Sequence, residues 1–302
     1  MIVVEKILSH YSSESPGIRT NLARLLNHGK LCGTGKIIIQ AVDQGFEHGP
    51  ARSFVDNLIA MDPNYHFQIA CDAGISGYAA PIGWLQQAVD NFVGKLPLIL
   101  KINSSNSLYS SKNQPDQSLT ATVDDALRLG CIGVGFTLYP GSDANLNLIN
   151  NAKKIIAEAR SKGLITILWS YARGGDISKE NESALDVVSY GAHMACLLGA
   201  HIVKVKLPNE RIALKANEDY YKKIPHRTPT ERVKHIVDAC FAGKRIVIFS
   251  GGEAKSDADL LTDTRAIQEG GGFGSIIGRN IFQRKREDAI CILSKIIDTL
   301  KS

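Results

Sequence analysis

The run Ala200-His-Ile-Val-Lys-Val-Lys-Leu-Pro208 shows the pattern that decides the fold of this chain, a short apolar strand that ends in polar residues. Two apolar residues precede Lys204 and Val205 follows it, which predicts that this lysine lies in a buried strand. Lysine is rarely buried without a partner, because an ammonium ion loses its hydration there. A lysine desolvated in this way has a lowered pKa and becomes a nucleophilic amine that can form a Schiff base with a carbonyl.

Seven further runs are similarly rich in β-forming apolar residues. After residue 35, such runs alternate with amphipathic stretches. Most are nearly continuous in Val, Ile and Leu, as expected of parallel strands covered on both faces. The stretches between them have helical periodicity, for example Leu146–Lys162 and Thr230–Ala242, and polar caps mark helix starts at Thr228 and Ser256. The predicted strands are Lys36–Val42, Gly77–Pro81, Pro97–Asn103, Ile132–Leu138, Leu164–Ser170, Ala200–Lys206, Arg245–Ser250 and Gly274–Gly278.

Eight strand-then-helix units of this length predict an α/β fold of the (β/α)8 TIM barrel type. A doubly wound sheet has the same periodicity and is the main alternative. However, no Gly-x-Gly-x-x-Gly follows a strand near the start, which disfavours dinucleotide binding. Residues 1–35, amphipathic at Ile18–Leu26, predict a short helical N-terminal extension that caps or flanks the barrel. We therefore expect an extension at residues 1–35 and a barrel catalytic domain at residues 36–302.

Composition and charge disfavour several other classes. A formal net charge of +5 over 302 residues is compatible with anionic small molecules, but no dense Lys/Arg block predicts a nucleic-acid partner. No apolar run approaches the roughly 20 residues that span a bilayer, and the first residues do not have the order of a signal peptide. We expect a cytoplasmic protein without a membrane partner, in which the scattered cysteines are reduced core residues: Cys32, Cys71, Cys131, Cys196, Cys240 and Cys291.

Polar residues collect where the predicted strands end. The reactive residues of such barrels lie at the C-terminal ends of the strands, so these side chains are expected to share one rim. The first strand is followed by Asp43-Gln-Gly-Phe-Glu-His48, and the fifth runs into Trp169-Ser-Tyr-Ala-Arg173. The candidate residues from these and neighbouring strand ends are Asp43, Gln44, His48, Lys101, Trp169, Tyr171, Arg173, Lys204 and Lys206.

The last two strands end in glycines, at Ser250-Gly251-Gly252 and Gly278-Arg279. Loops after strands seven and eight of such barrels often bind phosphate through backbone N–H groups and a helix N-terminus. Glycine lets the backbone approach an anion closely, and Arg279 adds a possible guanidinium contact. Turns also use such glycines, but their presence at both strands predicts a phosphate site.

Lys204 and Lys206 are two residues apart and point to the same face of a strand. Two neighbouring ammonium groups disfavour each other's charge, which would lower one pKa. We expect Lys204, nearer the strand centre, to form the imine, with Lys206 as the alternative or as a phosphate or carboxylate partner at the mouth. The sequence does not decide between them on geometry.

An imine former also needs a group that moves a proton at the carbon–carbon bond, and Tyr171 and Asp43 are the candidates. The alternatives are a packed aromatic for Tyr171 and a turn-forming or helix-capping carboxylate for Asp43. We expect Trp169 to be a pocket wall. His48 either contacts an anion or lies in a surface loop, and Lys101 reaches the mouth or pairs with Asp43.

The remaining histidines are scattered, with no spacing typical of a metal site, so we expect neither a metal nor a cofactor.

In order along the chain, these motifs resemble the archaeal-type class I fructose-bisphosphate aldolases, in particular their bacterial branch. The motifs are Ala41-Val-Asp-Gln-Gly-Phe-Glu-His-Gly-Pro50, Trp169-Ser-Tyr-Ala-Arg-Gly174, Ile202-Val-Lys-Val-Lys-Leu-Pro208, Ser250-Gly-Gly252 and Gly278-Arg-Asn280. The resemblance implies a metal-independent homo-oligomeric barrel enzyme that cleaves fructose 1,6-bisphosphate to glycerone phosphate and glyceraldehyde 3-phosphate, with Lys204 as Schiff-base lysine and Tyr171 as proton donor.

The resemblance also implies substrate contacts. Asp43, His48 and Arg173 would act around the sugar, with residues 250–252 and 278–279 on a phosphate. This chain departs from the archaeal pattern at Gln44, where those proteins often have histidine, and at Leu207-Pro208, where an aromatic is common. The alternatives are a related Schiff-base lyase, synthase or thiolase for another phosphorylated ketose, and an inactive phosphosugar-binding protein.

Overall fold

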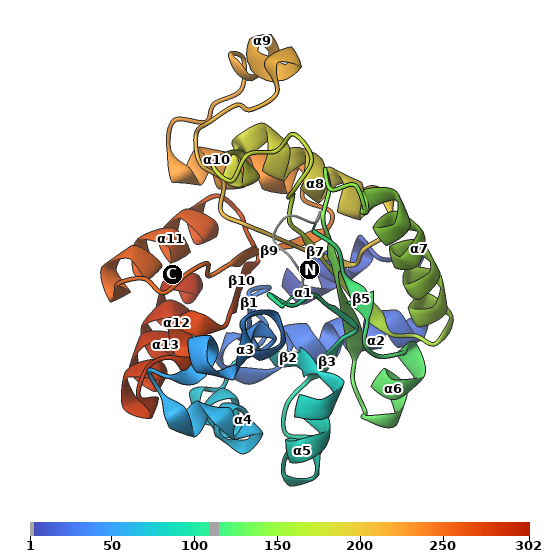
Figure 1. The fold of residues 1–302 in the computed structure, drawn as a ribbon, viewed down its shortest axis with the longest axis vertical. Coiled ribbons are helices and arrows are strands. Elements are labelled where there is room, and N and C mark those ends of the chain that lie inside the picture. The colour runs from blue at the N-terminus through green and yellow to red at the C-terminus, as the bar shows by residue number, and fades with distance from the viewer. Residues whose placement is uncertain (1–2, 109–114) are drawn as a thin grey trace.

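The computed structural model describes residues 3–108 and 115–302. Its eight long strands form a closed barrel in which every neighbouring pair is parallel, in the order β1-β10-β9-β8-β7-β6-β3-β2 (Figure 1). The predicted TIM barrel is therefore confirmed and the doubly wound sheet was the wrong alternative. The strands are β1 Ile37–Ala41, β2 Gly77–Pro81, β3 Leu98–Lys101, β6 Gly133–Leu138, β7 Ile165–Ser170, β8 Ile202–Val205, β9 Ile246–Ser250 and β10 Gly274–Ile277.

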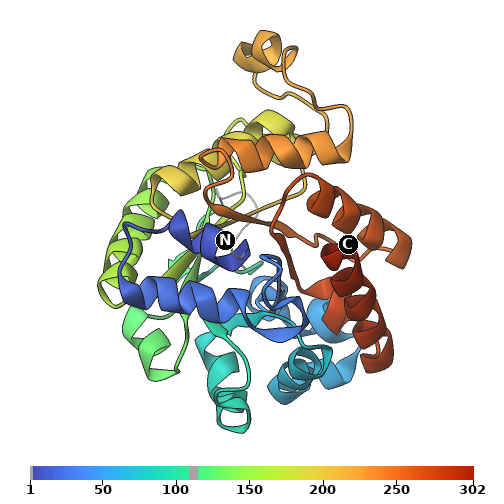
Figure 2. The ribbon, with the colours of Figure 1, turned by 180° about the vertical axis from the view of Figure 1, so that it is seen from behind.

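Helices surround the barrel on all sides (Figures 1 and 2). They are α3 Gln44–Phe54, α4 Pro63–Ala73, α5 Ile82–Phe92, α6 Val123–Arg128, α7 Asn145–Ser161, α8 Leu185–Leu197, α10 Pro229–Ala239, α11 Asp257–Glu269, α12 Arg279–Phe282 and α13 Arg286–Lys301. Both predicted caps are present, because the side chains of Thr228 and Ser256 accept hydrogen bonds from backbone N–H groups in the first turns of α10 and α11.

Helix α10 ends earlier than its amphipathic pattern predicts. Its last residue is Ala239 rather than Ala242, since Phe241 and Ala242 both have a positive φ, at 58° and 54°. A left-handed residue cannot continue a right-handed helix, and for a residue with a Cβ this conformation is strained. The hydrophobic periodicity of the sequence predicted the apolar face of this helix, but it did not predict the turn between the helix and β9.

Two N-terminal helices, α1 Val3–Ser9 and α2 Pro16–Leu26, lie across the end of the barrel where the strands begin (Figure 2). Their apolar residues join the side chains inside the barrel in one buried cluster. Between them, the hydroxyl of Tyr11 donates to His201 O at 2.6 Å and accepts from Ile246 N at 3.0 Å. This end of the barrel is therefore closed, which leaves the opposite end as the mouth.

Several connections depart from simple strand-then-helix units. The predicted strand Pro97–Asn103 is divided, since β3 ends at Lys101 and β4 Asn103–Ser104 pairs with β5 Ser118–Leu119 in a separate two-stranded sheet. After β8 an arm carrying η4 Lys215–Asn217 and α9 Glu218–Tyr221 projects beyond α10 (Figure 1). The other short 3-10 helices are η1 Gly29–Leu31, η2 Leu58–Met61 and η3 Asn181–Ser183.

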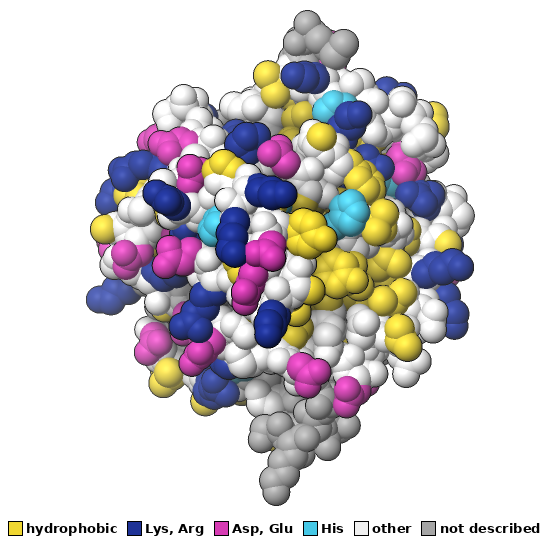
Figure 3. Space-filling model, turned by 90° about the horizontal axis from the view of Figure 1, so that it is seen from above, with side chains coloured by type: hydrophobic (Ala, Val, Ile, Leu, Met, Phe, Trp, Pro, Cys, Tyr) yellow, Lys and Arg dark blue, Asp and Glu magenta, His cyan; other side chains and the backbone are white. Residues whose placement is uncertain are grey.

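Figure 3 looks onto the side of the molecule from which α9 projects. Acidic and basic side chains are interspersed there, beside a patch of hydrophobic ones, and no stripe of one charge is visible on this face. The large hydrophobic side chains that are exposed on the molecule include Tyr190 and Leu197 of helix α8. No helix among the described residues is long and apolar enough to cross a bilayer.

Candidate active site

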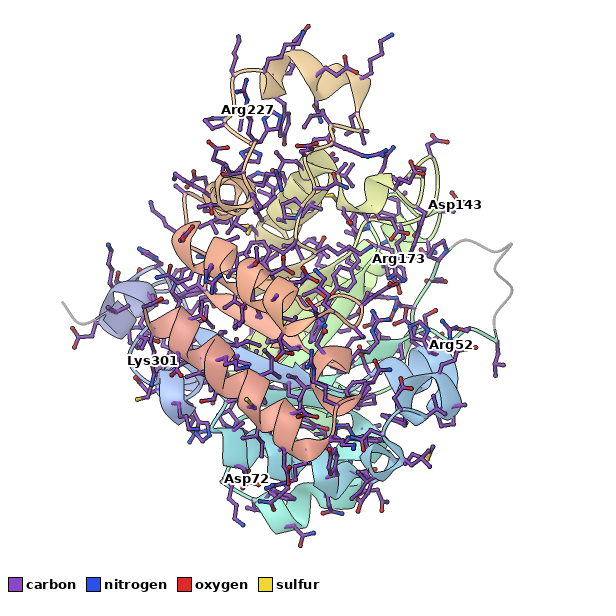
Figure 4. All side chains as sticks on the ribbon, turned by 90° about the vertical axis from the view of Figure 1, so that its left-hand side faces the viewer. Arg52, Asp72, Asp143, Arg173, Arg227 and Lys301 are labelled. Carbon is purple, nitrogen blue, oxygen red and sulfur yellow. The ribbon has the colours of Figure 1, made fainter. Side chains whose placement is uncertain are left out.

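A cavity of about 530 Å³ opens at the end of the barrel where the strands finish. Eight lysine or arginine side chains and four carboxylates line it, so much of the chain's excess positive charge faces one opening. Figure 4 shows two of these residues, Arg52 and Arg173, at one end of the molecule, with Lys301 of α13 toward the other. Low-dielectric walls of one predominant sign focus the field and attract anions.

Lys204 lies on the inner wall of this cavity. Within β8 the side chains alternate, so that Ile202 belongs to the cluster inside the barrel while Val203 and Val205 face the surrounding helices. Lys204, two residues after Ile202, therefore also points inward and is only 7% exposed. Its Nζ lies 5.1 Å from the ring centroid of Trp169 and 5.4 Å from that of Tyr171.

Burial lowers the pKa of Lys204 to about 8, while the charges of Asp43 and Glu47 act to raise it and that of Arg279 lowers it further. At pH 7 about one Lys204 in ten would then carry a neutral amine, compared with a few in ten thousand for an exposed lysine. The sequence prediction of a buried, activated amine thus has a clear structural basis.

Lys101 at the end of β3 is a second buried amine, 3% exposed. Its Nζ donates to the backbone oxygen of Asn103 and, at 2.9 Å, to its Oδ1. Burial lowers the pKa of Lys101 to about 8; the charge of Asp43 raises it and that of Lys204 lowers it. Asn103 is itself fixed by two hydrogen bonds to the backbone of Thr137 on β6.

Lys206 is placed differently from the arrangement that strand alternation predicts. Strand β8 ends at Val205, and the Nζ of Lys206 forms an ion pair with Glu182 at 2.5 Å. Lys101, rather than Lys206, is therefore the lysine whose charge interacts with Lys204. The sequence predicted that Lys204 and Lys206 would lie side by side on one strand. It gave no sign that Lys101, on another strand, would be the lysine near Lys204.

Tyr171 follows β7 and lines the cavity beside Lys204. Burial raises the pKa of Tyr171 well above its usual value, and a hydrogen bond with Ser250 lowers it in part. The hydroxyl therefore stays protonated at neutral pH and is suited to donating a proton. Trp169 is 1% exposed, and its ring lies under both buried amines, since Lys101 Nζ is 5.7 Å from its centroid.

Asp43 occupies the N-cap position of α3, but its side chain makes no capping hydrogen bond. It lines the cavity, and its charge acts on both buried lysines. These observations favour the functional role over the capping role that the sequence also allowed. Gln44 begins α3, but its side chain lies outside the described residues.

His48, Glu47 and Arg173 form a charged group on one wall. The Nε2 of His48 lies 3.9 Å from a Glu47 oxygen, and Arg173 pairs with Glu47 at 3.3 Å. The guanidinium of Arg173 also stacks on Tyr139, 5.2 Å from its ring centroid. Burial lowers the pKa of His48, so this histidine is neutral at pH 7. Its Nδ1 has no hydrogen-bond partner within the described chain.

The glycine-rich ends of β9 and β10 form a corner of the same cavity, which Ser250, Gly251, Gly252, Gly278 and Arg279 all line. Gly252 has a φ of 71°, a conformation that favours glycine. Asn280 fixes the loop, because its Nδ2 donates to Gly251 O at 3.0 Å and its Oδ1 accepts from Lys255 N at 2.8 Å. Bare backbone beside a guanidinium suits an anion.

The structure thus brings the predicted strand-end residues other than Gln44 to one cavity, and the lining residues that were not predicted include Glu47, Tyr139 and Glu182. Glu47 lies in the motif that follows the first strand, directly before the candidate His48, and its place in that loop was the available signal. Tyr139 directly follows the predicted strand Ile132–Leu138, and this position was its signal, whereas Glu182 gave no local signal. Among the described residues no group of His, Cys, Asp and Glu could hold a metal ion, and all six cysteines are free thiols.

A barrel with a buried lysine on one wall and an anion-binding corner defines a Schiff-base aldolase site. The sequence model of the DeoC/LacD family aldolases matches residues 37–284, and this chain belongs to that family.

Its relatives in this family are fructose-bisphosphate aldolases. A probable class 1 enzyme from Chlamydia muridarum is 30% identical, over 95% of this chain and 85% of the relative. The class 1 enzyme of Thermoproteus tenax is 35% identical, over 83% of this chain and 85% of the relative. A relative from Methanocaldococcus jannaschii, 31% identical over 87% of this chain and 81% of its own length, is a fructose-bisphosphate aldolase/6-deoxy-5-ketofructose 1-phosphate synthase.

A solved structure of an archaeal fructose-1,6-bisphosphate aldolase, with its catalytic lysine covalently bound to the carbinolamine intermediate of the substrate, is also similar. It superimposes with a TM-score of 0.76 at 30% identity, over 89% of this chain and 95% of that chain.

Proposed function

We propose that this protein is a class I fructose-bisphosphate aldolase, which reversibly cleaves fructose 1,6-bisphosphate to glycerone phosphate and glyceraldehyde 3-phosphate in glycolysis and gluconeogenesis. The observation that carries the proposal is Lys204, a buried amine with a pKa of about 8 that shares one cavity with an anion-binding corner. The family membership and the relatives' activity support the same reaction.

The substrate is positioned by its phosphate. Backbone N–H groups and Arg279 at the ends of β9 and β10 bind one phosphate, and this places the ketose carbonyl against Lys204. Positioning of a reactant in this way can lower the activation free energy of an enzymatic reaction by about 7–11 kcal/mol. The surplus of cationic side chains around the cavity suits a substrate with a second phosphate.

The neutral amine of Lys204 attacks the C2 carbonyl and forms a carbinolamine, which loses water to give a protonated imine. The carboxylate of Asp43 takes the proton of the C4 hydroxyl as the C3–C4 bond breaks. The bonding electrons move into the imine and produce an enamine, and glyceraldehyde 3-phosphate leaves. Tyr171 then donates its hydroxyl proton to C3 and regains a proton from Asp43, and hydrolysis of the resulting imine releases glycerone phosphate and the free lysine.

Borohydride reduction in the presence of glycerone phosphate tests this proposal. The expected result is a stable secondary amine on Lys204, located by fragment-ion mapping, in a protein whose activity a chelator does not reduce. Absence of any adduct on Lys204 and Lys206 would rule out the covalent mechanism.

A related synthase activity is the second candidate, because one relative at 31% identity has both activities. Comparison of turnover with fructose 1,6-bisphosphate and with deoxy and seven-carbon sugar phosphates separates the two. The cytoplasmic location and the homo-oligomeric state are part of the same proposal; the free thiols support the first, and light scattering of the purified protein tests the second.

A further inference from the structure

Glu182 is a buried carboxylate at the mouth of the cavity, with its side chain 9% exposed. Its Oε2 contacts three cations: Lys206 Nζ at 2.5 Å, Lys179 Nζ at 3.3 Å and Arg173 Nε at 3.9 Å. Lys179 is largely exposed, whereas Lys206 and Arg173 are mostly buried. The strongest of these contacts is thus a short hydrogen-bonded ion pair with Lys206.

The position of Glu182 is fixed by the backbone. It lies in η3, in the connection from β7 to α8, and this segment is joined to the connection that follows β8. Asn209 N donates to Ser183 O at 2.8 Å, and Leu185 N donates to Arg211 O at 2.9 Å. Both bonds are made by residues that closely follow Glu182, and they hold this segment, with its carboxylate, beside Lys206, the residue directly after β8.

The two lysines at this strand end therefore have different surroundings in one cavity. Lys204 faces aromatic rings, and burial is the main influence on its pKa. Burial also lowers the pKa of Lys206, and Arg173 and Lys179 add to this effect, but the hydrogen bond and the charge of Glu182 oppose it. Burial alone would raise the pKa of Glu182, but the hydrogen bond and charge of Lys206 outweigh it and lower that pKa, so Glu182 is ionised at neutral pH.

On the basis of the Schiff-base function above, we propose that Glu182 is a positioning residue that holds Lys206 as a charged ion pair and thereby reserves imine formation for Lys204. A protonated amine has no lone pair with which to attack a carbonyl, and a carboxylate at hydrogen-bonding distance favours the protonated form. Without the carboxylate, Lys206 would be left in a buried site between two cations. It would then lose its proton more readily and become a second nucleophile on the same wall.

The variant Glu182→Gln tests the inference, because it removes the charge and keeps the shape. Each protein is incubated with glycerone phosphate and sodium borohydride. The amine adds to the carbonyl, water is lost, and hydride reduces the imine to a secondary amine that fragment-ion mapping assigns to residue 204 or 206. The native protein should carry the adduct on Lys204 alone, and Glu182→Gln should carry an additional adduct on Lys206.

Glu180→Gln is the matched control. Glu180 lies two residues away in the same segment, is 74% exposed and pairs with Arg211 at 3.1 Å, so its replacement makes the same charge change without touching Lys206. Its adduct should stay on Lys204. The double variant Glu182→Gln with Lys206→Met should lose the second adduct and keep the first. Lys206→Met alone should also keep a full adduct on Lys204, which tests the inference even if Glu182→Gln does not fold.

The outcomes separate the two proposals. No adduct on either lysine of the native protein overturns the proposed function. An adduct on Lys204 in the native protein and an unchanged pattern in folded Glu182→Gln overturns the role of Glu182 alone. Loss of the Lys204 adduct in a folded Lys206→Met that still binds glycerone phosphate would also overturn it, because Lys206 would then take part in imine formation.

Discussion

Lys204→Met should abolish aldolase activity and at the same time make the protein more stable at neutral pH. Methionine has a similar unbranched shape without a charge, so it can occupy the inner wall of the barrel. The native lysine has a pKa of about 8 in place of its ordinary 10.5. At about 1.4 kcal/mol per pKa unit, this difference corresponds to about 3 kcal/mol of destabilisation when the buried lysine is protonated.

The pH dependence gives the prediction its sign. Between pH 8 and 10.5 the unfolded chain binds a proton at Lys204 that the folded protein does not, so the stability of the native protein rises with pH over this range. Below pH 8 both forms are protonated and the full destabilisation is present; above 10.5 it is absent. The contacts of Lys204 with Trp169 and Tyr171 offset about 1 kcal/mol, which leaves a net gain of about 2 kcal/mol for Lys204→Met at pH 7.

Urea unfolding followed by circular dichroism, repeated from pH 7 to pH 10, measures this gain. The difference in unfolding free energy between Lys204→Met and the native protein should shrink as the pH rises. Lys206→Met provides the contrast, because it removes the ion-pair partner of Glu182 and should destabilise the protein by about 1–3 kcal/mol. If Lys204→Met is less stable than the native protein at pH 7, or if the difference does not change with pH, the buried-amine reasoning is wrong.

Three other predictions follow from the site. The value of kcat/KM should rise about tenfold per pH unit below pH 8 and then level off, because Lys204 must be neutral to attack; a profile that is flat below pH 8 would contradict this. Tyr171→Phe should reduce kcat by about 10²–10⁴ while borohydride still traps the Lys204 adduct, and a variant that retains full turnover would exclude Tyr171 as the proton donor. Gly135→Ala should reduce activity, since a Cβ there would lie 1.9 Å from ring atoms of Trp169, whereas Gly83→Ala meets nothing within 4 Å and should be tolerated; equal activity of the two variants would show that the position of Trp169 is not critical.

The fold could be predicted from the sequence because its signal is local. Each β-rich run and each amphipathic stretch has its own period, and the number and length of the eight units favoured the barrel, which the structure confirms, over a doubly wound sheet of the same periodicity. Local signals were weaker where the backbone changes direction. Neither the end of α10 before Phe241 nor the division of the third strand at Lys101 changes the hydrophobic pattern enough to be seen in the sequence.

The sequence alone determined that Lys204 lies within an apolar strand and that Asp43, Tyr171 and Arg279 follow other strands. These residues were expected to meet because parallel strands of a barrel end at one rim. Only the tertiary structure decided which charges meet there. The charge of Lys204 acts on Lys101, and Glu182 pairs with Lys206, across segments that have no fixed spacing along the chain. The physical reason is that electrostatic interaction and burial depend on distances through space, and these distances exist only once the barrel has closed and its loops have joined.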